Sequence, residues 1–279
     1  NKELMKFDER LQNSGTKFDT PEYTEPGGED YKELIFKLKN KPKSEIDYYP
    51  IEQTDTSGNK KLSGFNYRSP SVHFGTKNEF AHVRFKTRYM EDPPMPSNEL
   101  KVLTVEEMQS DIVQDMSKNF GERVTDFPFK NNWYELVSKR LIRYAADNDF
   151  DAVAIPKGST IASRYKQKIV KKDGKISGSG KGKAELYDLA IPSFLKKYGK
   201  KWNAKVYDDN LFRSTASVTG EEFKDLPVTI IQLTDDMKKS VQQDGQALFE
   251  IFGIGSATAV GANAVSDSMK NNTISQKTN

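Results

Sequence analysis

The residues that could do chemistry in this chain gather in one short stretch, 105–111. Within seven positions it holds two glutamates, a glutamine, a serine and an aspartate. The stretch follows an apolar run, 100–105, that is typical of a buried strand. Functional groups often lie where strands pass into loops. The stretch is therefore a candidate site, although the same residues also suit a solvated helix start with Ser110 or Asp111 as N-cap.

A second polar row precedes this stretch. His82, Arg84 and Lys86 alternate with apolar residues over 80–89, which predicts a strand with one polar face. Alternate residues of a strand point to the same face, so His82 and Arg84 share one face.

The same parity places the acidic residues of the third strand, 100–108. Glu107 and Gln109 should point to one face, and Glu106 and Ser110 to the other. If the two strands pair, Arg84 and Glu107 should lie close together. The candidate catalytic residues are His73, Arg84, Glu106, Glu107, Gln109 and Asp111, and further candidates are His82, Lys130, Lys139, Arg143 and Tyr165.

Two chemistries fit the candidate set. The spacing of His73-Phe74-Gly75-Thr76 and the later Glu-x-Gln resembles that of ADP-ribosyltransferases. Those enzymes hold a dinucleotide with His or Arg and stabilise the sugar cation with Glu. The alternative is metal-assisted phosphate hydrolysis, with Mg²⁺ on the oxygens of Glu106, Glu107 and Asp111.

Composition limits the remaining options. The 279 residues include no Cys and only two His, which excludes a disulfide framework and does not favour a thiolate or His-rich metal site. We therefore assign no metal ligands and no cofactor from the sequence. Hydrophobic residues make up 35% and charged residues 30%, which predicts a folded domain with polar tails because 16 Phe and 12 Tyr must pack somewhere.

Positive charge is concentrated between residues 164 and 205. This region has thirteen Lys and Arg but three acidic residues. It could attract the phosphates of genomic DNA, or it could be a solvated Lys-rich surface. The candidate phosphate-binding residues are Arg164, Lys171, Lys172, Lys181 and Lys183.

The helices and strands that the sequence pattern indicates around these residues predict an α+β fold. We expect a single domain in which a few helices pack on a mixed β-sheet. The strongest helix is 132–148, where Trp133, Leu136 and Leu141 recur at helical spacing. Further strands are expected at 31–39, 151–156 and 228–233, and further helices at 3–12, at 185–198 with an interruption near Pro192, and at 235–243 with Thr234 as N-cap. A long loop or weak hairpin is expected at 40–70, a rigid connector at 93–96 and a flexible Gly/Lys/Ser loop at 174–182.

Three segments are expected along the chain. They are a tail or linker at 1–20, the α+β domain at 21–250 and a flexible tail at 251–279, rich in Gly, Ala and Ser. The uncharged part of this tail, 251–265, is too short and too weakly apolar for a membrane span but could contact a membrane. The chain begins with Asn rather than Met, so we expect a processed product or a piece of a longer protein.

Several stretches together resemble a domain of very large bacteriophage proteins, the multidomain "polyvalent" proteins, in which it often lies near the C-terminus. The stretches are Pro26–Leu34, His73-Phe74, Asn78–Arg84, Val105–Asp111, Pro128–Trp133, Lys139–Ala146, Ser163–Tyr165, Ile231–Met237 and Gln246–Phe249. The resemblance covers about residues 21–250. This chain departs from it at Ile112, where members usually have Trp, and after Gly158.

The resemblance implies a virion protein that is packaged and delivered with the phage genome. Its partners would be other virion proteins and, through the Lys-rich region, genomic DNA. Its location would be the virion, and after delivery the host cytoplasm or cell envelope. The alternative is a phage-encoded enzyme with one of the two chemistries above.

Overall fold

The computed structural model describes residues 7–12, 16–38, 51–54, 56–58, 60–64, 73–75, 79–92, 95–115, 131–211 and 225–243. The chain divides into two units, Asn1–Leu248 and Phe249–Asn279, and every described residue lies in the first. The tail expected at 251–279 therefore lies outside the described residues.

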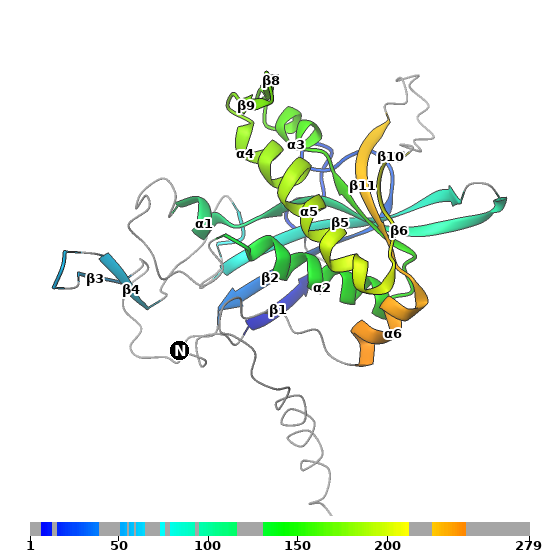
Figure 1. Cartoon of the computed structure of the whole chain (residues 1–279), viewed down its shortest axis with the longest axis horizontal. Helices are drawn as coiled ribbons and strands as arrows, with labels where there is room; N and C mark the ends of the chain where they lie inside the picture. The colour runs from blue at the N-terminus through cyan, green and yellow to red at the C-terminus, as the bar shows by residue number, and fades with distance from the viewer. Residues whose placement is uncertain are drawn as a thin grey trace, which may run out of the picture. The chain divides into compact units, whose positions relative to one another are not determined.

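The protein has the α+β fold that the sequence predicts, built on one seven-stranded mixed sheet (Figure 1). The strand order is β1-β2-β5-β6-β7-β11-β10. Only β6 and β7 run parallel; the other neighbours are antiparallel. The strands of the sheet are β1 (Phe7–Gln12), β2 (Glu29–Leu38), β5 (Glu79–Asp92), β6 (Met95–Gln109), β7 (Ala152–Pro156), β10 (Val206–Leu211) and β11 (Leu226–Gln232).

Two small hairpins and several helices complete the described part of the chain. The hairpins are β3 (Ile51–Thr54) with β4 (Lys60–Gly64) and β8 (Val170–Lys172) with β9 (Lys175–Ser177). The helices are α1 (Asp111–Asp115), α2 (Trp133–Asp147), α3 (Gly158–Arg164), α4 (Lys181–Ala184), the π-helix η4 (Glu185–Ala190), α5 (Ile191–Gly199), the 3₁₀ helix η5 (Lys200–Trp202) and α6 (Asp235–Gln243).

Helix α2 covers one face of the sheet, with α5 beside it (Figure 1). Its predicted apolar stripe is confirmed, because Trp133, Leu136 and Leu141 are all buried. Tyr144 packs edge-on against Phe85 of β5 at 5.2 Å between ring centroids. The face of β5 that carries Phe85 is therefore the core face, and the polar residues of β5 point to the opposite face.

The prediction of an N-terminal helix at 3–12 is wrong for the described part of that range, residues 7–12. Residues Phe7–Gln12 form β1, which pairs antiparallel with β2 from Phe7–Leu38 to Gln12–Glu33. The ladder satisfies the backbone groups of β1 that face β2, so tertiary pairing overrides a weak local helix preference. The prediction of a loop at 174–182 is wrong in part. Residues Lys175–Ser177 form β9, which pairs with β8, and Lys181 begins α4.

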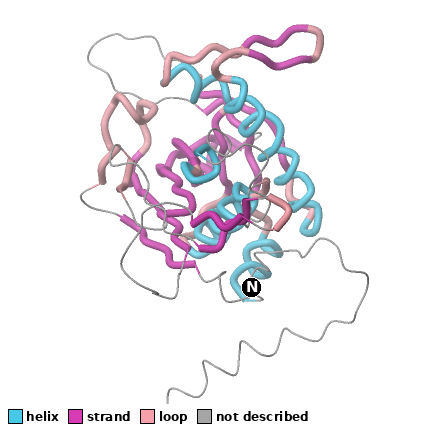
Figure 2. The backbone as a smooth tube through the Cα atoms, turned by 90° about the vertical axis from the view of Figure 1, so that its left-hand side faces the viewer, coloured by secondary structure: helices cyan, strands magenta, loops and turns pink. Residues whose placement is uncertain are grey.

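The helix expected at 185–198 forms, but it is not interrupted near Pro192; the residues before Pro192 depart from α-helical geometry without breaking the helix. Residues 181–199 run as one continuous helical rod (Figure 2), but Glu185–Ala190 is π-helical and α5 starts at Ile191. Proline has no N–H for the preceding turn, so a wider turn before it removes the clash. The N-cap expected at Thr234 is confirmed, since its Oγ1 accepts the amide of Met237 at 3.2 Å.

Among the described residues, no helix combines the length and apolar character needed to cross a membrane.

The burial of the α2 stripe gives a direct stability prediction. Leu141→Ala should lower the free energy of unfolding by about 2–5 kcal/mol, because it removes a fully buried side chain that the core cannot refill. Urea denaturation measures this loss. Asp147→Ala on the same helix is the control and should cost less than about 1 kcal/mol, since it breaks only an exposed pair with Arg143. Equal losses in the two variants would contradict the packing described.

Candidate functional site

A β-bulge decides how the two glutamates of β6 point. Arg84 pairs with Glu107, but the next residue of β5, Phe85, pairs with Val105. One extra residue, Glu106, is thus inserted into β6 opposite β5. Glu106 and Glu107 consequently both contact the polar face of β5, and the predicted orientation of Glu106 toward the other face is wrong. Simple strand parity fails because the bulge adds one residue.

The polar face of β5 carries Arg84, Lys86 and Arg88, all buried. Their cationic groups lie against residues 16–28, here called the N-terminal strap. Arg84 donates to the Tyr23 carbonyl at 2.9 Å, and Arg88 donates to the Pro26 carbonyl at 2.9 Å. Lys86 donates to the carbonyls of residues 25 and 27 at 3.4 and 3.5 Å. Three strand cations thus hold one irregular segment by its backbone.

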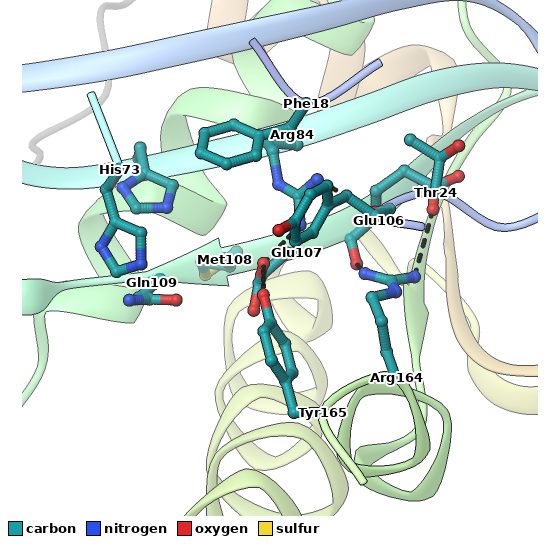
Figure 3. Close-up of polar contacts among 12 residues, drawn as sticks. Phe18, Thr24, His73, Arg84, Glu106, Glu107, Met108, Gln109, Arg164 and Tyr165 are labelled. Carbon is teal, nitrogen blue, oxygen red and sulfur yellow. Dashed lines mark hydrogen bonds and ion pairs between the residues drawn. The ribbon is translucent and has the colours of Figure 1, made fainter. Parts of the chain in front are cut away.

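Arg84 and Glu107 form the ion pair that strand parity predicts, and both are buried (Figure 3). Tyr165 donates its hydroxyl to Glu107 at 2.6 Å, and the Lys183 ammonium lies 3.8 Å from the same carboxylate. Burial raises the pKa of Glu107, but the charges of Arg84 and Lys183 and the Tyr165 hydrogen bond outweigh it and lower the pKa to about 2. Glu107 is therefore an ionised, fully engaged carboxylate at neutral pH.

Glu106, like Glu107, has several hydrogen-bond and ion-pair partners. It accepts from Arg88 at 2.9 Å, from the Glu25 amide of the strap at 2.7 Å and from Arg164 at 3.4 Å. Arg164 also donates to the Glu25 carboxylate at 3.0 Å. We call Arg84, Arg88, Glu106, Glu107 and Arg164 the buried ion-pair network. In the described part of the chain, Nε of Arg88 is its one buried side-chain polar atom without a hydrogen-bond partner.

Side chains also complete the exposed edge of β6. Strand β7 pairs only with Val102–Thr104 of β6, so the backbone beyond that point needs other partners. The Tyr187 hydroxyl bonds both the amide and the carbonyl of Met108, at 2.7 and 2.8 Å, and Arg164 donates to the Glu106 carbonyl at 3.0 Å. Helices α3 and η4 thus take the place of a further strand.

The strap is held at its other end by Glu33 of β2. This fully buried carboxylate accepts the Phe18 amide at 3.0 Å, the Lys17 amide at 3.3 Å and the Tyr31 hydroxyl at 3.0 Å. The Phe18 ring lies 5.1 Å from the Arg84 guanidinium, a cation–π distance.

A second polar group lies further along β5 and β6 and contains His73, Glu79, His82 and Asp111; we call it the His–carboxylate cluster. His73 Nδ1 lies 2.7 Å from Asp111, and His82 Nδ1 lies 2.7 Å from Glu79. The Asp111 hydrogen bond raises the pKa of His73. Burial raises the pKa of Asp111, but His73 and His82 outweigh it, and the pKa is lowered.

The backbone at the end of β6 is fixed beside this cluster. Ser110 is the N-cap of α1, as one of the two sequence interpretations predicts, since its Oγ accepts the Val113 amide at 3.4 Å. The same hydroxyl donates to the Phe80 carbonyl at 2.6 Å. Gln109 donates to the Asp111 carboxylate. Gln109 and Asp111 thus join the His–carboxylate cluster rather than the buried ion-pair network.

The predicted phosphate-binding residues do not share one environment. Lys171, Lys172 and Lys181 are exposed on β8 and α4. Arg164 is buried in the ion-pair network, and Lys183 is partly buried beside Glu107. The Lys-rich surface available to a partner is therefore the β8–β9 hairpin and the start of α4.

The further candidate residues, Tyr165, Lys139, Arg143 and Lys130, also lie in different environments. Tyr165 contacts Glu107, whereas Lys139 is buried with its ammonium 5.6 Å from the Tyr198 ring centroid. Arg143 donates to Asp147 and to the Val241 carbonyl. Lys130 lies outside the described residues. Sequence reasoning missed Glu25, Glu33 and Glu79, which come from different strands and the strap, and Arg88, which strand parity with Arg84 could have found.

Comparison with known proteins adds no assignment to this geometry. No protein-family model matches the chain, and no curated protein or solved structure matches it.

Gly28 at the end of the strap tests how tightly the strap is held. Its φ is +76°, and an added Cβ would lie 3.1 Å from Arg88 Cγ and 3.1 Å from the Thr87 carbonyl oxygen. Gly28→Ala should lower the unfolding free energy by more than the roughly 1–2 kcal/mol that a positive φ costs an L-residue.

Gly58→Ala is the matched control, because Gly58 has φ +80° and open space around its Cβ. Thermal denaturation measures the stability lost in each variant. The loss in Gly58→Ala reports backbone strain alone, and any additional loss in Gly28→Ala reports the contact with Arg88 and Thr87. If the two lose the same stability, the strap is not packed against Arg88 as described.

Glu107→Gln tests the buried ion-pair network. The change keeps the size of the side chain but leaves Arg84 buried without its counter-charge, so the unfolding free energy should fall by about 3–5 kcal/mol. Urea denaturation at neutral pH measures it. Glu185→Gln is the control and should cost less than about 1 kcal/mol, since its 3.6 Å pair with Lys181 is exposed.

The same variant carries a pH signature. The pKa of Glu107 is about 2 in the folded protein against an ordinary 4.5, so its stabilising contribution is complete above 4.5 and is lost as the pH falls through 2. The stability difference between wild type and Glu107→Gln should therefore shrink on acidification over this window. A difference that stays constant over that window would show that Glu107 is not held as an ion.

Proposed function

We propose that this protein is the C-terminal part of a bacteriophage virion protein that accompanies the genome, and that its folded domain is a structural module. The resemblance of residues 21–250 to a domain of very large phage proteins supports the virion assignment. The observation that carries the structural role is the pairing of Arg84 with Glu107 in the interior.

The state of the carboxylates favours a structural module over an enzyme. A general acid or base needs access to substrate and a pKa near the working pH. Glu107 is 3% exposed, its pKa is about 2, and it already contacts Arg84, Tyr165 and Lys183. Glu106 is 1% exposed and is held by Arg88, Arg164 and the strap.

The positions of the histidines also favour a structural module over an enzyme. Both enzyme chemistries require the candidate residues to converge on a substrate, and the ADP-ribosyltransferase alternative requires His73 beside Arg84 and Glu107. Instead, His73 pairs with Asp111 at 2.7 Å, while Arg84 pairs with Glu107. The six candidates thus divide between two contact groups, the buried ion-pair network and the His–carboxylate cluster.

The proposed partners are other virion proteins and genomic DNA. The exposed lysines of the β8–β9 hairpin and α4 form the surface that would meet phosphate. Residues 251–265, proposed as a weak membrane contact, lie outside the described residues.

Mass spectrometry of purified phage particles tests the virion assignment. Peptides from this chain should co-purify with the capsid proteins through a density gradient at a constant ratio. Their absence from intact particles would overturn the assignment. If the purified chain instead consumes NAD or hydrolyses phosphate esters, and Glu107→Gln removes that activity without unfolding the chain, the enzyme alternative replaces it.

The DNA contact has its own test. The affinity of the purified chain for duplex DNA should fall steeply with salt, because each phosphate neutralised releases a counterion. Charge reversal of Lys171, Lys172 and Lys181 to Glu should abolish this binding, whereas the same three positions changed to Arg should preserve it. Unchanged binding by the Glu triple variant would exclude this surface, and filter binding across a salt series decides between the outcomes.

A further inference from the structure

Both histidines of the chain lie in the His–carboxylate cluster, although they are nine residues apart in sequence. The His73 and His82 rings are 5.9 Å apart between centroids. Glu79, His82 and Asp111 each offer one ligand atom, and these atoms all lie within 4.8 Å of one another. His73 Nδ1 lies 2.7 Å from the Asp111 carboxylate and so borders the same space.

We propose that Glu79, His82, Asp111 and His73 bind one divalent transition-metal ion, with Zn²⁺ as the best match. Imidazole nitrogen and carboxylate oxygen are ligands that Zn²⁺ accepts in four-coordinate sites. Two imidazoles argue against Mg²⁺ and Ca²⁺, which prefer oxygen ligands alone. The four residues are spread over a loop, a strand and a helix start, so no local sequence motif marks the site.

The burial of the cluster suits a structural ion. Glu79, His82 and Asp111 are buried, and His73 is partly exposed on the loop side. Four protein ligands fill a tetrahedral ion and leave no position for substrate, which is typical of structural zinc sites. Such an ion would fasten residues 73–75 to β5 and to the start of α1.

The surroundings orient the ligands. Gln109 donates to the second oxygen of Asp111, and Ser110 fixes the turn between β6 and α1 through the Phe80 carbonyl. The Phe74 ring packs against His82 at 4.8 Å between centroids and against Phe18 at 5.2 Å. Hydrogen bonds behind the ligands and an apolar wall beside them are what bound metals require to keep geometry and exclude water.

Metal binding moves protons and separates each Nδ1 from the carboxylate oxygen that now lies 2.7 Å away. Each Nδ1 that now shares a proton with a carboxylate must present its lone pair to a metal bound there, so that proton moves to Nε2 or is released to solvent. The carboxylates bind as anions, and the ion replaces the shared protons between Nδ1 and oxygen. This site does not depend on the virion assignment, since it rests on contacts outside the buried ion-pair network.

Metal titration of the full chain tests the proposal. After removal of metal with a chelator and dialysis, the protein should bind one Zn²⁺ per chain in competition with a chromophoric chelator, and Zn²⁺ should raise its Tm. Co²⁺ in place of Zn²⁺ should give the visible absorption of a tetrahedral site. Failure of the folded wild type to bind either ion would leave two metal-free His–carboxylate pairs and overturn the proposal.

Variants locate the ion. His73→Ala and Asp111→Asn should each weaken Zn²⁺ binding by at least about 100-fold and abolish the rise in Tm. Asp188→Asn is the matched control, because that carboxylate is partly buried and bonds Gly158 and Lys171 away from the cluster, so it should bind Zn²⁺ like wild type.

Circular dichroism establishes that each variant is folded. His73 is partly exposed, so His73→Ala keeps the test valid even if Asp111→Asn fails to fold. Zn²⁺ binding that persists at full strength in His73→Ala and Asp111→Asn would place the ion elsewhere and overturn the site.

Discussion

The β-bulge at Glu106 is the constraint on which the rest of this site depends. In a regular strand, Glu106 and Glu107 would point to opposite faces, and one of them would enter the apolar core beneath α2. The extra residue turns both carboxylates toward the cations of β5. Buried charges are tolerated only when they are paired and hydrogen-bonded, so the bulge makes a charged interior possible here.

The strap follows from the same constraint. Arg84, Lys86 and Arg88 have more donors than the two glutamates can accept. Backbone carbonyls of residues 23, 25, 26 and 27 accept further hydrogen bonds from them, while Nε of Arg88 has no partner. A segment with little regular structure is thus held against the sheet, and its residues Phe18 and Thr24 are buried. Within the polar stretch 105–111, Glu106 binds this segment and Glu107 binds Arg84, whereas Gln109 and Asp111 belong to the His–carboxylate cluster.

Much of the fold could be predicted from local pattern, because α2 and the central strands have clear periodicity. Parity also predicted the Arg84–Glu107 pair. It failed at Glu106, where the bulge sets the core-facing residues Val105 and Met108 three positions apart instead of two. It failed at Phe7–Gln12 too, where pairing with β2 decides the structure.

Contacts between segments that are far apart in the chain could not be predicted from a single sequence. Glu25 meets Arg164 across 139 positions, and Asp111 meets His73 across 38. Neither partner carries a local signal of the other. The grouping of His73, Glu79, His82 and Asp111 therefore appears only once the end of the sheet is built.

Hydrogen exchange in the strap tests the central claim most directly. The amides of Phe18 and Glu25 are bonded to buried carboxylates of Glu33 and Glu106 rather than to a strand. If the buried ion-pair network makes the strap part of the core, these amides should exchange together with those of β5, through global unfolding. Fast exchange of Phe18 and Glu25 while the β5 amides remain protected would show that the strap opens on its own, and would contradict the account.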